Sequence, residues 1–210
     1  GLGGLNFAGT VTAGEHSQPA QTPFSQRAII QSEPNNKVTF SGVIATGAGN
    51  RLNFQPVSNS MFEFAGSESN TIWGRFLPHG NDNATANFVF NNSGTTTLKG
   101  YNNFAGIITT NRHHNTYIQR GTLVVDHIFN DDPDTNNSTQ VPDGINNDAD
   151  LYLLRGATLL FNQSETVGYL ATQKGSTIQV PTDVTLRLDD NTNHVINGNL
   201  EGDGSLALDA

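Results

Sequence analysis

Short pairs of apolar residues, spaced i and i+2, recur at a nearly constant interval through the C-terminal part of the chain, from Leu151 onward. Side chains at i and i+2 of an extended chain point to the same side, so each pair marks a strand with one apolar face. Three such sets in each repeat predict three strands in each coil. The sets, each with a step of 27 or 28 positions, are Leu151/Leu153, Ile178/Val180 and Leu206/Leu208; Leu159/Phe161 and Leu186/Leu188; and 167–170 and 194–196.

A repeat of this length predicts a β-solenoid. A coil of about 20 to 30 residues cannot bury its inward face alone, so it must stack on its neighbours and place equivalent residues on top of one another. We therefore expect Leu153, Val180 and Leu208 to form one interior ladder. An antiparallel sandwich of short strands is the alternative, but a sandwich has no reason to keep a constant step. Turn-forming residues separate the expected strands at Arg155-Gly156, Lys174-Gly175, 189–191 and Asn197-Gly198.

The whole chain, residues 1–210, is predicted to be a single all-β segment: a right-handed parallel β-helix of about 25–28 residues per coil, with loop excursions. Residues 94–210 form its regular coils, with an insertion rich in Asp and Asn at 130–150. Residues 1–93 are less regular. Three prolines between 15 and 35 predict an excursion from the stack there, or a cap on the first coil. The apolar pairs of residues 1–93 are Val38/Phe40, Leu52/Phe54, Phe62/Phe64 and Phe88/Phe90.

Composition and charge exclude several classes of function. The formal net charge is -9, and only ten Lys and Arg residues are present, which argues against binding to nucleic acids or anionic membranes. Cysteine is absent, so disulfides, thiolate metal sites and a Cys nucleophile are excluded. No apolar run approaches the ~18 residues of a membrane span. The first residue is Gly1, so we expect a processed mature end or an excised fragment.

One stretch carries a family resemblance. The residues from Leu98 to Gly106, then 107–110, then Gly121-Thr122-Leu123-Val124-Val125, resemble the autotransporter-associated β-strand repeat. The matching places are taken by Leu98, Gly100, Asn102, Phe104, Gly106 and Thr109, with further elements at 156–159 and 202–206.

The resemblance implies a right-handed β-helix passenger that is exported to the cell surface or released. Such passengers serve as adhesive or spacer shafts and are usually joined to an outer-membrane barrel. This chain shows no barrel-like strands of its own, so we expect no direct membrane insertion. Residues 111–115 and 130–150 depart from the repeat, and we expect both to be loops that bulge from the coil.

The insertion contains a candidate calcium loop. Hard cations take oxygen ligands from positions 1, 3, 5, 7, 9 and 12 of a twelve-residue loop. Asn137 occupies the sharp-turn position and tolerates left-handed backbone. A solvated acidic loop is the alternative, because Thr139 stands at the usual apolar position 8 and no flanking helices are evident. The candidate calcium ligands are Asp132, Asp134, Asn136, Ser138, Gln140 and Asp143.

Residues suited to catalysis are scattered. Three lysines, Lys37, Lys99 and Lys174, are far apart in the sequence, and the carboxylate pair Asp189-Asp190 is typical of a turn. The sequence therefore predicts no catalytic residue, and no cofactor beyond the candidate calcium.

Histidine and serine add no catalytic pattern. His113 and His114 are adjacent, so on an extended chain they point in opposite directions and cannot chelate together. Three serines, Ser25, Ser164 and Ser205, lack the nucleophile-elbow context.

Exposed aromatic side chains could form a platform for carbohydrate, because sugars stack on aromatic faces. Packing of each ring at a strand or turn is the alternative. The candidate platform residues are Trp73, Tyr101, Tyr117, Tyr152 and Tyr169.

We therefore expect a structural or adhesive extracellular β-solenoid, part of a surface or secreted passenger or filament, and no enzyme. Its expected partners are itself or further coils of a longer chain through the solenoid ends, and surface glycans or host receptors. The alternative function is a carbohydrate-active β-helix, such as a polysaccharide lyase or tailspike-like depolymerase. Acidic and basic side chains converging in one groove would favour that enzyme.

Overall fold

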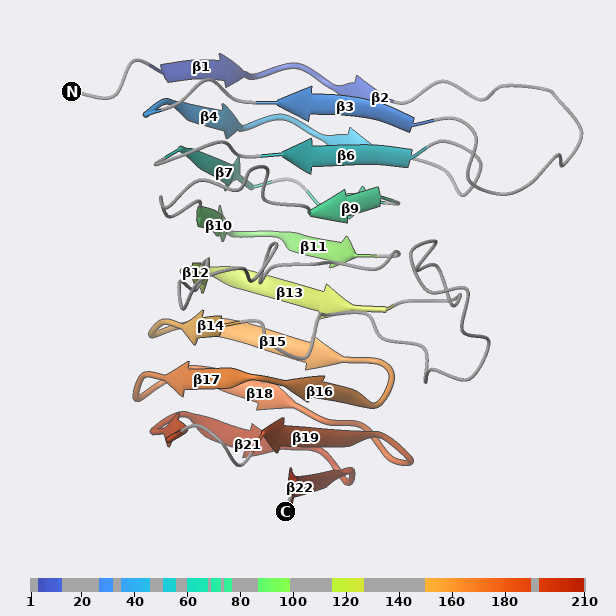
Figure 1. The fold of residues 1–210 in the computed structure, drawn as a ribbon, viewed down its shortest axis with the longest axis vertical. Coiled ribbons are helices and arrows are strands. Elements are labelled where there is room, and N and C mark those ends of the chain that lie inside the picture. Colours follow the sequence, from blue (N-terminus) through green and yellow to red (C-terminus); the bar gives the residue numbers. More distant parts are fainter. Residues whose placement is uncertain are drawn as a thin grey trace, which may run out of the picture.

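The computed structural model describes residues 4–12, 27–31, 35–45, 51–55, 60–67, 69–72, 74–76, 87–98, 115–126, 150–189 and 193–209. Every strand pair in this part of the chain is parallel, and successive strands alternate between sheets that run along the same stack (Figure 1). The described residues contain no helix that could cross a membrane. The all-β parallel solenoid predicted from the sequence is confirmed, and the antiparallel sandwich is excluded.

Two eight-stranded sheets run the length of the stack. Sheet A is built from the first strand of each coil: β1 (Gly4–Phe7), β4 (Lys37–Phe40), β7 (Met61–Gly66), β10 (Asn87–Asn92), β12 (Asn115–Ile118), β14 (Asp150–Leu153), β17 (Tyr169–Thr172) and β20 (Val195–Ile196). Sheet B is built from the second: β2 (Val11–Thr12), β5 (Ile44–Ala45), β8 (Asn70–Ile72), β11 (Thr95–Leu98), β13 (Gly121–Val125), β15 (Ala157–Phe161), β18 (Thr177–Gln179) and β21 (Asn199–Glu201).

The third face is divided into two three-stranded sheets. The N-terminal one contains β3 (Arg27–Gln31), β6 (Arg51–Gln55) and β9 (Gly74–Phe76), and the C-terminal one contains β16 (Glu165–Val167), β19 (Thr185–Asp189) and β22 (Ser205–Asp209). The excursion expected at 15–35 therefore includes a strand of the stack, β3. The rest of that stretch, apart from Asn35, lies outside the described residues.

The average coil agrees with the sequence prediction, but individual coils vary. Seven steps in sheet A lead from Asn6 to Val195, so the average step is about 27 positions, within the predicted range. The shortest of these steps leads from Tyr152 to Ala171, and the longest leads from Tyr117 to Tyr152. The longest step contains the insertion predicted at 130–150, so the stack tolerates an insertion without losing its pairing.

The interior ladder predicted for the last coils is wrong. Leu153 pairs with Thr172, while Ile178 pairs with Leu159 in sheet B. Leu208 pairs with Leu188 on the third face. The proposed equivalence of Leu159/Phe161 with Leu186/Leu188 fails for the same reason, since β15 and β19 belong to different sheets.

The physical reason is that all three faces carry the same i, i+2 pattern. One coil in this region takes the chain from Leu159 to Ile178, which are register partners in sheet B. The step from Leu151 to Leu159 takes the chain from sheet A to sheet B within one coil. The apparent repeat from Leu151 to Ile178 is therefore the sum of two steps. One full coil leads from Leu151 to Leu170 in sheet A, and the chain then passes from sheet A to Ile178 in sheet B.

The core consists of stacked ladders of identical or similar side chains. In sheet A, Phe7, Phe40, Phe64 and Phe90 are in register, and successive ring centroids are 5.2, 5.3 and 5.2 Å apart with nearly parallel planes. Phe54 of β6 closes this core edge-on, 5.2 Å from Phe64. Ile118 and Leu153 take the place of phenylalanine in the next two coils, and both are fully buried.

The corner between sheets A and B is a short turn whose backbone continues the ladder. The amides of Gln119, Leu154 and Gln173 each donate to a carbonyl of the preceding coil, over 2.8 to 2.9 Å. Glycine is required at Gly121, because its φ is +70° and a Cβ would collide with the Asn92 carbonyl oxygen. Predicted turns at Arg155-Gly156, Lys174-Gly175 and Asn197-Gly198 are confirmed at this corner.

Candidate functional site

The outer face of sheet A gathers aromatic side chains from four successive coils. Along β14 and β17 the leucines point into the core, so Tyr152 and Tyr169 point outward. Tyr117 of β12 is in register with Tyr152. His194, immediately before β20, extends the row by one coil. We call these four residues the aromatic ladder.

The rings of the aromatic ladder stack on one another. The centroids of Tyr117 and Tyr152 are 5.0 Å apart with an interplanar angle of 26°. Those of Tyr152 and Tyr169 are 5.5 Å apart and tilted by 57°. Tyr169 and His194 are 6.2 Å apart at 20°. Because much of each face is used by the neighbouring ring, the ladder offers ring edges and polar atoms outward rather than open faces.

Burial and neighbouring charge affect the middle of the ladder. Burial raises the pKa of Tyr152 above its usual value of 10.0, and the Asp150 carboxylate and the phenols of Tyr169 and Tyr117 raise it further. The Tyr152 phenol is therefore protonated at neutral pH and can donate a hydrogen bond. Asp150 is only 8% exposed, so its charge lies largely beneath the surface.

His194 is fixed by the backbone of the coil before it. The Leu170 amide donates a hydrogen bond to His194 Nδ1 over 3.2 Å. Nδ1 can accept only when it carries no proton, so this bond selects the tautomer with its proton on Nε2. The imidazole ring is thereby held at the end of the ladder.

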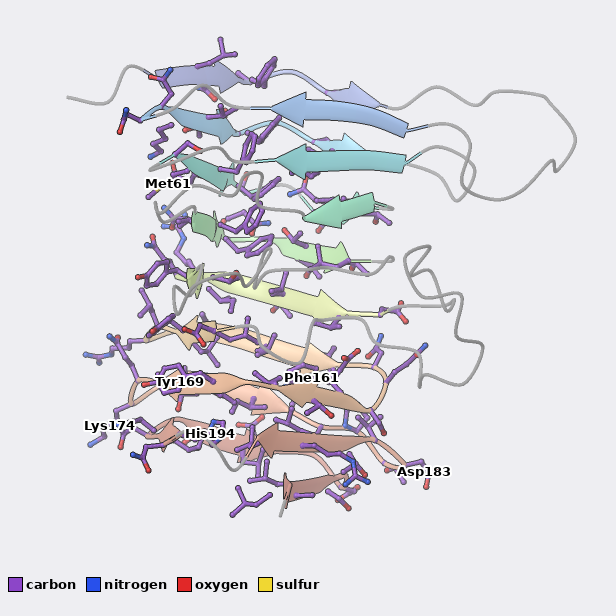
Figure 2. All side chains as sticks on the ribbon, viewed as in Figure 1. Met61, Phe161, Tyr169, Lys174, Asp183 and His194 are labelled. Carbon is purple, nitrogen blue, oxygen red and sulfur yellow. The ribbon has the colours of Figure 1, made fainter. Side chains whose placement is uncertain are left out.

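A row of cations lies at the corner beside the ladder. Arg120, Arg155 and Lys174 each occupy the turn that follows a sheet A strand, in three successive coils, and all three are exposed. The Arg155 side chain extends over the next turn, where its Cγ lies 3.4 Å from the position of a Cβ on Gly175. Figure 2 shows Lys174, Tyr169 and His194 at the same end of the coils, away from Phe161 and Asp183.

In the first coils, the outer face of sheet A carries a network of polar and charged side chains in place of stacked aromatic rings. Lys37 forms an ion pair with Glu63 in the adjacent strand. Thr39 and Asn91 also donate to Glu63, over 3.3 and 3.2 Å. Burial raises the pKa of Glu63, but the hydrogen bonds from Lys37, Asn91 and Thr39 and the Lys37 charge outweigh it and hold the pKa below 4.5. This network joins three strands of the stack.

Several residues singled out in the sequence lie outside the described part of the chain. They include the whole candidate calcium loop, Asp132, Asp134, Asn136, Ser138, Gln140 and Asp143, so calcium binding stays a prediction. Lys99, His113, His114, Trp73, Tyr101 and Ser25 are outside it as well. Among the described residues, no group of three or more His, Asp or Glu side chains is placed to hold a metal ion.

The structure assigns structural positions to the remaining candidates. The Ser164 hydroxyl accepts a hydrogen bond from the Thr185 amide over 2.9 Å. Ser205 begins β22, and Asp189 ends β19.

Three of the five candidate platform residues, Tyr117, Tyr152 and Tyr169, do come together. Sequence reasoning missed His194 and the row of cations. A signal for the cations was present, because Tyr and Arg stand at the same spacing at 117–120 and at 152–155, directly before a turn.

Comparison of the chain with protein-family models, with curated proteins and with solved structures finds no significant match to any of them.

Proposed function

We propose that this chain is a segment of an extracellular structural and adhesive β-solenoid, displayed on a cell surface or secreted, whose outermost coils stack on further coils of a longer chain or on another copy. The observation that carries this proposal is the exposure of core-type side chains in the last coil. Leu206 and Leu208 of β22 are 43% and 70% exposed, whereas their register partners Leu186 and Leu188 are 0% and 2% exposed.

The other strands of that coil repeat the pattern. Leu200 of β21 is 47% exposed and stacks on Ile178, which is buried. At the opposite end of the stack, Leu5 of β1 is 57% exposed beside Val38, which is 7% exposed. Covering such surface is favourable by roughly 25 cal/mol per Å² of apolar area.

The backbone supports the same proposal. The strands β20, β21 and β22 are each the last of their sheet, and β1 and β2 are the first of theirs. An edge strand presents unpaired amides and carbonyls on one side, and a parallel strand from another coil pairs with them. Further coils of a longer chain, or a second copy stacked head to tail, would continue these sheets. Because the two surfaces differ, a contact between copies is heterologous and builds an open filament.

The test is the assembly state of the purified chain and of a Leu208→Lys variant, by light scattering and electron microscopy across a wide concentration range. We expect end-to-end species that grow with concentration, and their loss in Leu208→Lys because a buried charge at the contact is costly. Thr177→Lys, on the outer face of sheet B, adds the same charge elsewhere and should leave assembly unchanged. A monodisperse monomer at every concentration contradicts the stacking.

A carbohydrate-active enzyme is the alternative function. It would need acidic and basic side chains converging on a groove. The Glu63 carboxylate is instead engaged by Lys37, Thr39 and Asn91 on the outer face of sheet A. We expect the purified chain to leave a panel of polysaccharides intact. Release of reducing ends or of unsaturated products would replace the structural proposal with the enzymatic one.

A further inference from the structure

The three tyrosines of the aromatic ladder and the row of cations occupy the same three coils. Tyr117 and Arg120 belong to the coil of β12, Tyr152 and Arg155 to that of β14, and Tyr169 and Lys174 to that of β17. Three of the ten Lys and Arg residues of an acidic chain are thereby placed in one row. We call these six residues, with His194, the corner strip.

We propose that the corner strip binds a linear acidic polysaccharide, laid along the solenoid axis with its carboxylates on the row of cations. This inference deepens the adhesive function proposed above, on which it rests, and names the ligand class.

The spacing of the strip suits an extended polymer. Adjacent coils of a parallel sheet are ~4.8 Å apart, so equivalent side chains repeat at about the length of one sugar unit. Tyr117 and Tyr152 precede Arg120 and Arg155 by three positions, which limits their separation along the chain to roughly 10 Å, and Tyr169 precedes Lys174 by five, which limits it to roughly 17 Å. A chain of uronic acid units can therefore meet a cation and a phenol at successive coils.

The chemistry of the strip selects an acidic ligand over a neutral one. Neutral sugars are held mainly by open aromatic faces, and here neighbouring rings cover much of those faces. The edges present protonated phenols, such as that of Tyr152, which donate to or accept from sugar hydroxyls. Arginine binds a carboxylate through two parallel hydrogen bonds, and an exposed guanidinium group loses little hydration in doing so.

Asp150 is an acidic side chain beside the aromatic ladder. It is in register with Tyr169 and only 8% exposed, so it presents little of its carboxylate to a ligand. The three cations are exposed at the corner. The Leu170 amide, which donates to His194 Nδ1, holds the imidazole ring at the end of the strip.

Affinity electrophoresis in gels containing polygalacturonate tests the proposal, with dextran as the neutral polymer and low ionic strength throughout. One exposed charge pair accounts for roughly a two- to fivefold change in affinity. We expect the Arg120→Gln/Arg155→Gln/Lys174→Gln variant to bind polygalacturonate about tenfold more weakly. Arg187→Gln removes an exposed cation from the C-terminal sheet of the third face and is the control for a single lost charge. Its affinity for polygalacturonate should equal that of the parent chain. Arg155→Gln should bind polygalacturonate more weakly than the parent chain does.

Three results overturn the proposal: unchanged retention of the triple variant, equal retention of the parent chain by dextran, or tighter binding to single-stranded DNA than to polygalacturonate.

Tyr152→Phe keeps the stacked ring and removes only the hydroxyl. A two- to threefold loss of affinity for polygalacturonate would assign the Tyr152 phenol to the contact, and unchanged affinity would exclude that phenol from it. End-to-end assembly, which depends on β22 and β1, should be the same in all these variants. Failure of the glycan site is thus distinguishable from failure of the proposed stacking.

Discussion

Replacement of Phe64 by alanine should destabilise the solenoid more than the same truncation of Phe7 at the end of the phenylalanine ladder. Phe64 is fully buried and lies between two stacked rings, 5.3 Å from Phe40 and 5.2 Å from Phe90. A third ring, Phe54, meets it edge-on at 5.2 Å. The substitution therefore opens a cavity against three aromatic neighbours at once.

The magnitude follows from the area and the contacts. A buried phenylalanine removes about 200 Å² from water, which at ~25 cal/mol per Å² corresponds to ~5 kcal/mol. Truncations of buried phenylalanine cost about 3–5 kcal/mol, and we expect Phe64→Ala at the upper end. Phe7, which is half-buried and stacks on Phe40 at the end of the ladder, is the matched control. Phe7→Ala should cost roughly half as much.

Urea unfolding followed by circular dichroism measures both variants, and hydrogen exchange locates the effect. In a stacked repeat, each coil is stabilised by its neighbours, so the loss of protection should centre on β7 and extend to β4 and β10. Equal destabilisation by Phe64→Ala and Phe7→Ala would refute the reasoning, because a half-buried ring at the end of the ladder would then contribute as much stability as a fully buried ring inside it.

Three further predictions test separate features. Gly202→Ala should destabilise the last coils by several kcal/mol, because the φ of Gly202 is +101° and a Cβ there would collide with the Val180 carbonyl oxygen. Gly156 has a φ of +84° but open space around it, so Gly156→Ala should cost only about 1 kcal/mol. Thermal unfolding measures both variants. Glu63→Gln should reduce the loss of folding stability that occurs as the pH is lowered. Asp132→Ala should remove a calcium-binding event from calorimetry if the predicted loop binds the ion.

The pH dependence expected from Glu63 has a definite sign. Its pKa in the folded chain is lower than 4.5, so the unfolded chain binds more protons in this range. The contribution of Glu63 to stability is complete above pH 4.5 and is lost as the pH falls through the folded pKa. Glu63→Gln should therefore narrow the stability difference between pH 6 and pH 3, as measured by urea midpoints. An unchanged difference would show that the network on this face does not favour the ionised carboxylate.

The local strands could be predicted from the sequence because their signal is local. The pairs Phe62/Phe64 and Phe88/Phe90 were recognised as strands, and both lie in sheet A with those side chains buried. Turn glycines marked the corners for the same reason, since the backbone conformation at Gly156 and Gly175 is a property of a few residues.

The candidate site could be predicted only in part. Tyr117, Tyr152 and Tyr169 were recognised as a set, but nothing in the long sequence separation between the first two indicates that they touch. Their contact depends on how the chain returns to sheet A after residues 127–149, and that return is decided by pairing between distant strands.

By itself, the sequence determined that this chain folds into stacked parallel coils, because its i, i+2 apolar pairs and turn residues leave few other ways to bury the apolar faces. Only the tertiary structure decided which strand stacks on which, placing Leu153 beside Thr172 and not beside Val180. The reason is that all faces of the solenoid bury the same kinds of side chain, so the apolar pattern is the same whichever face a strand joins. Register, and with it the corner strip, is set by long-range backbone pairing and packing.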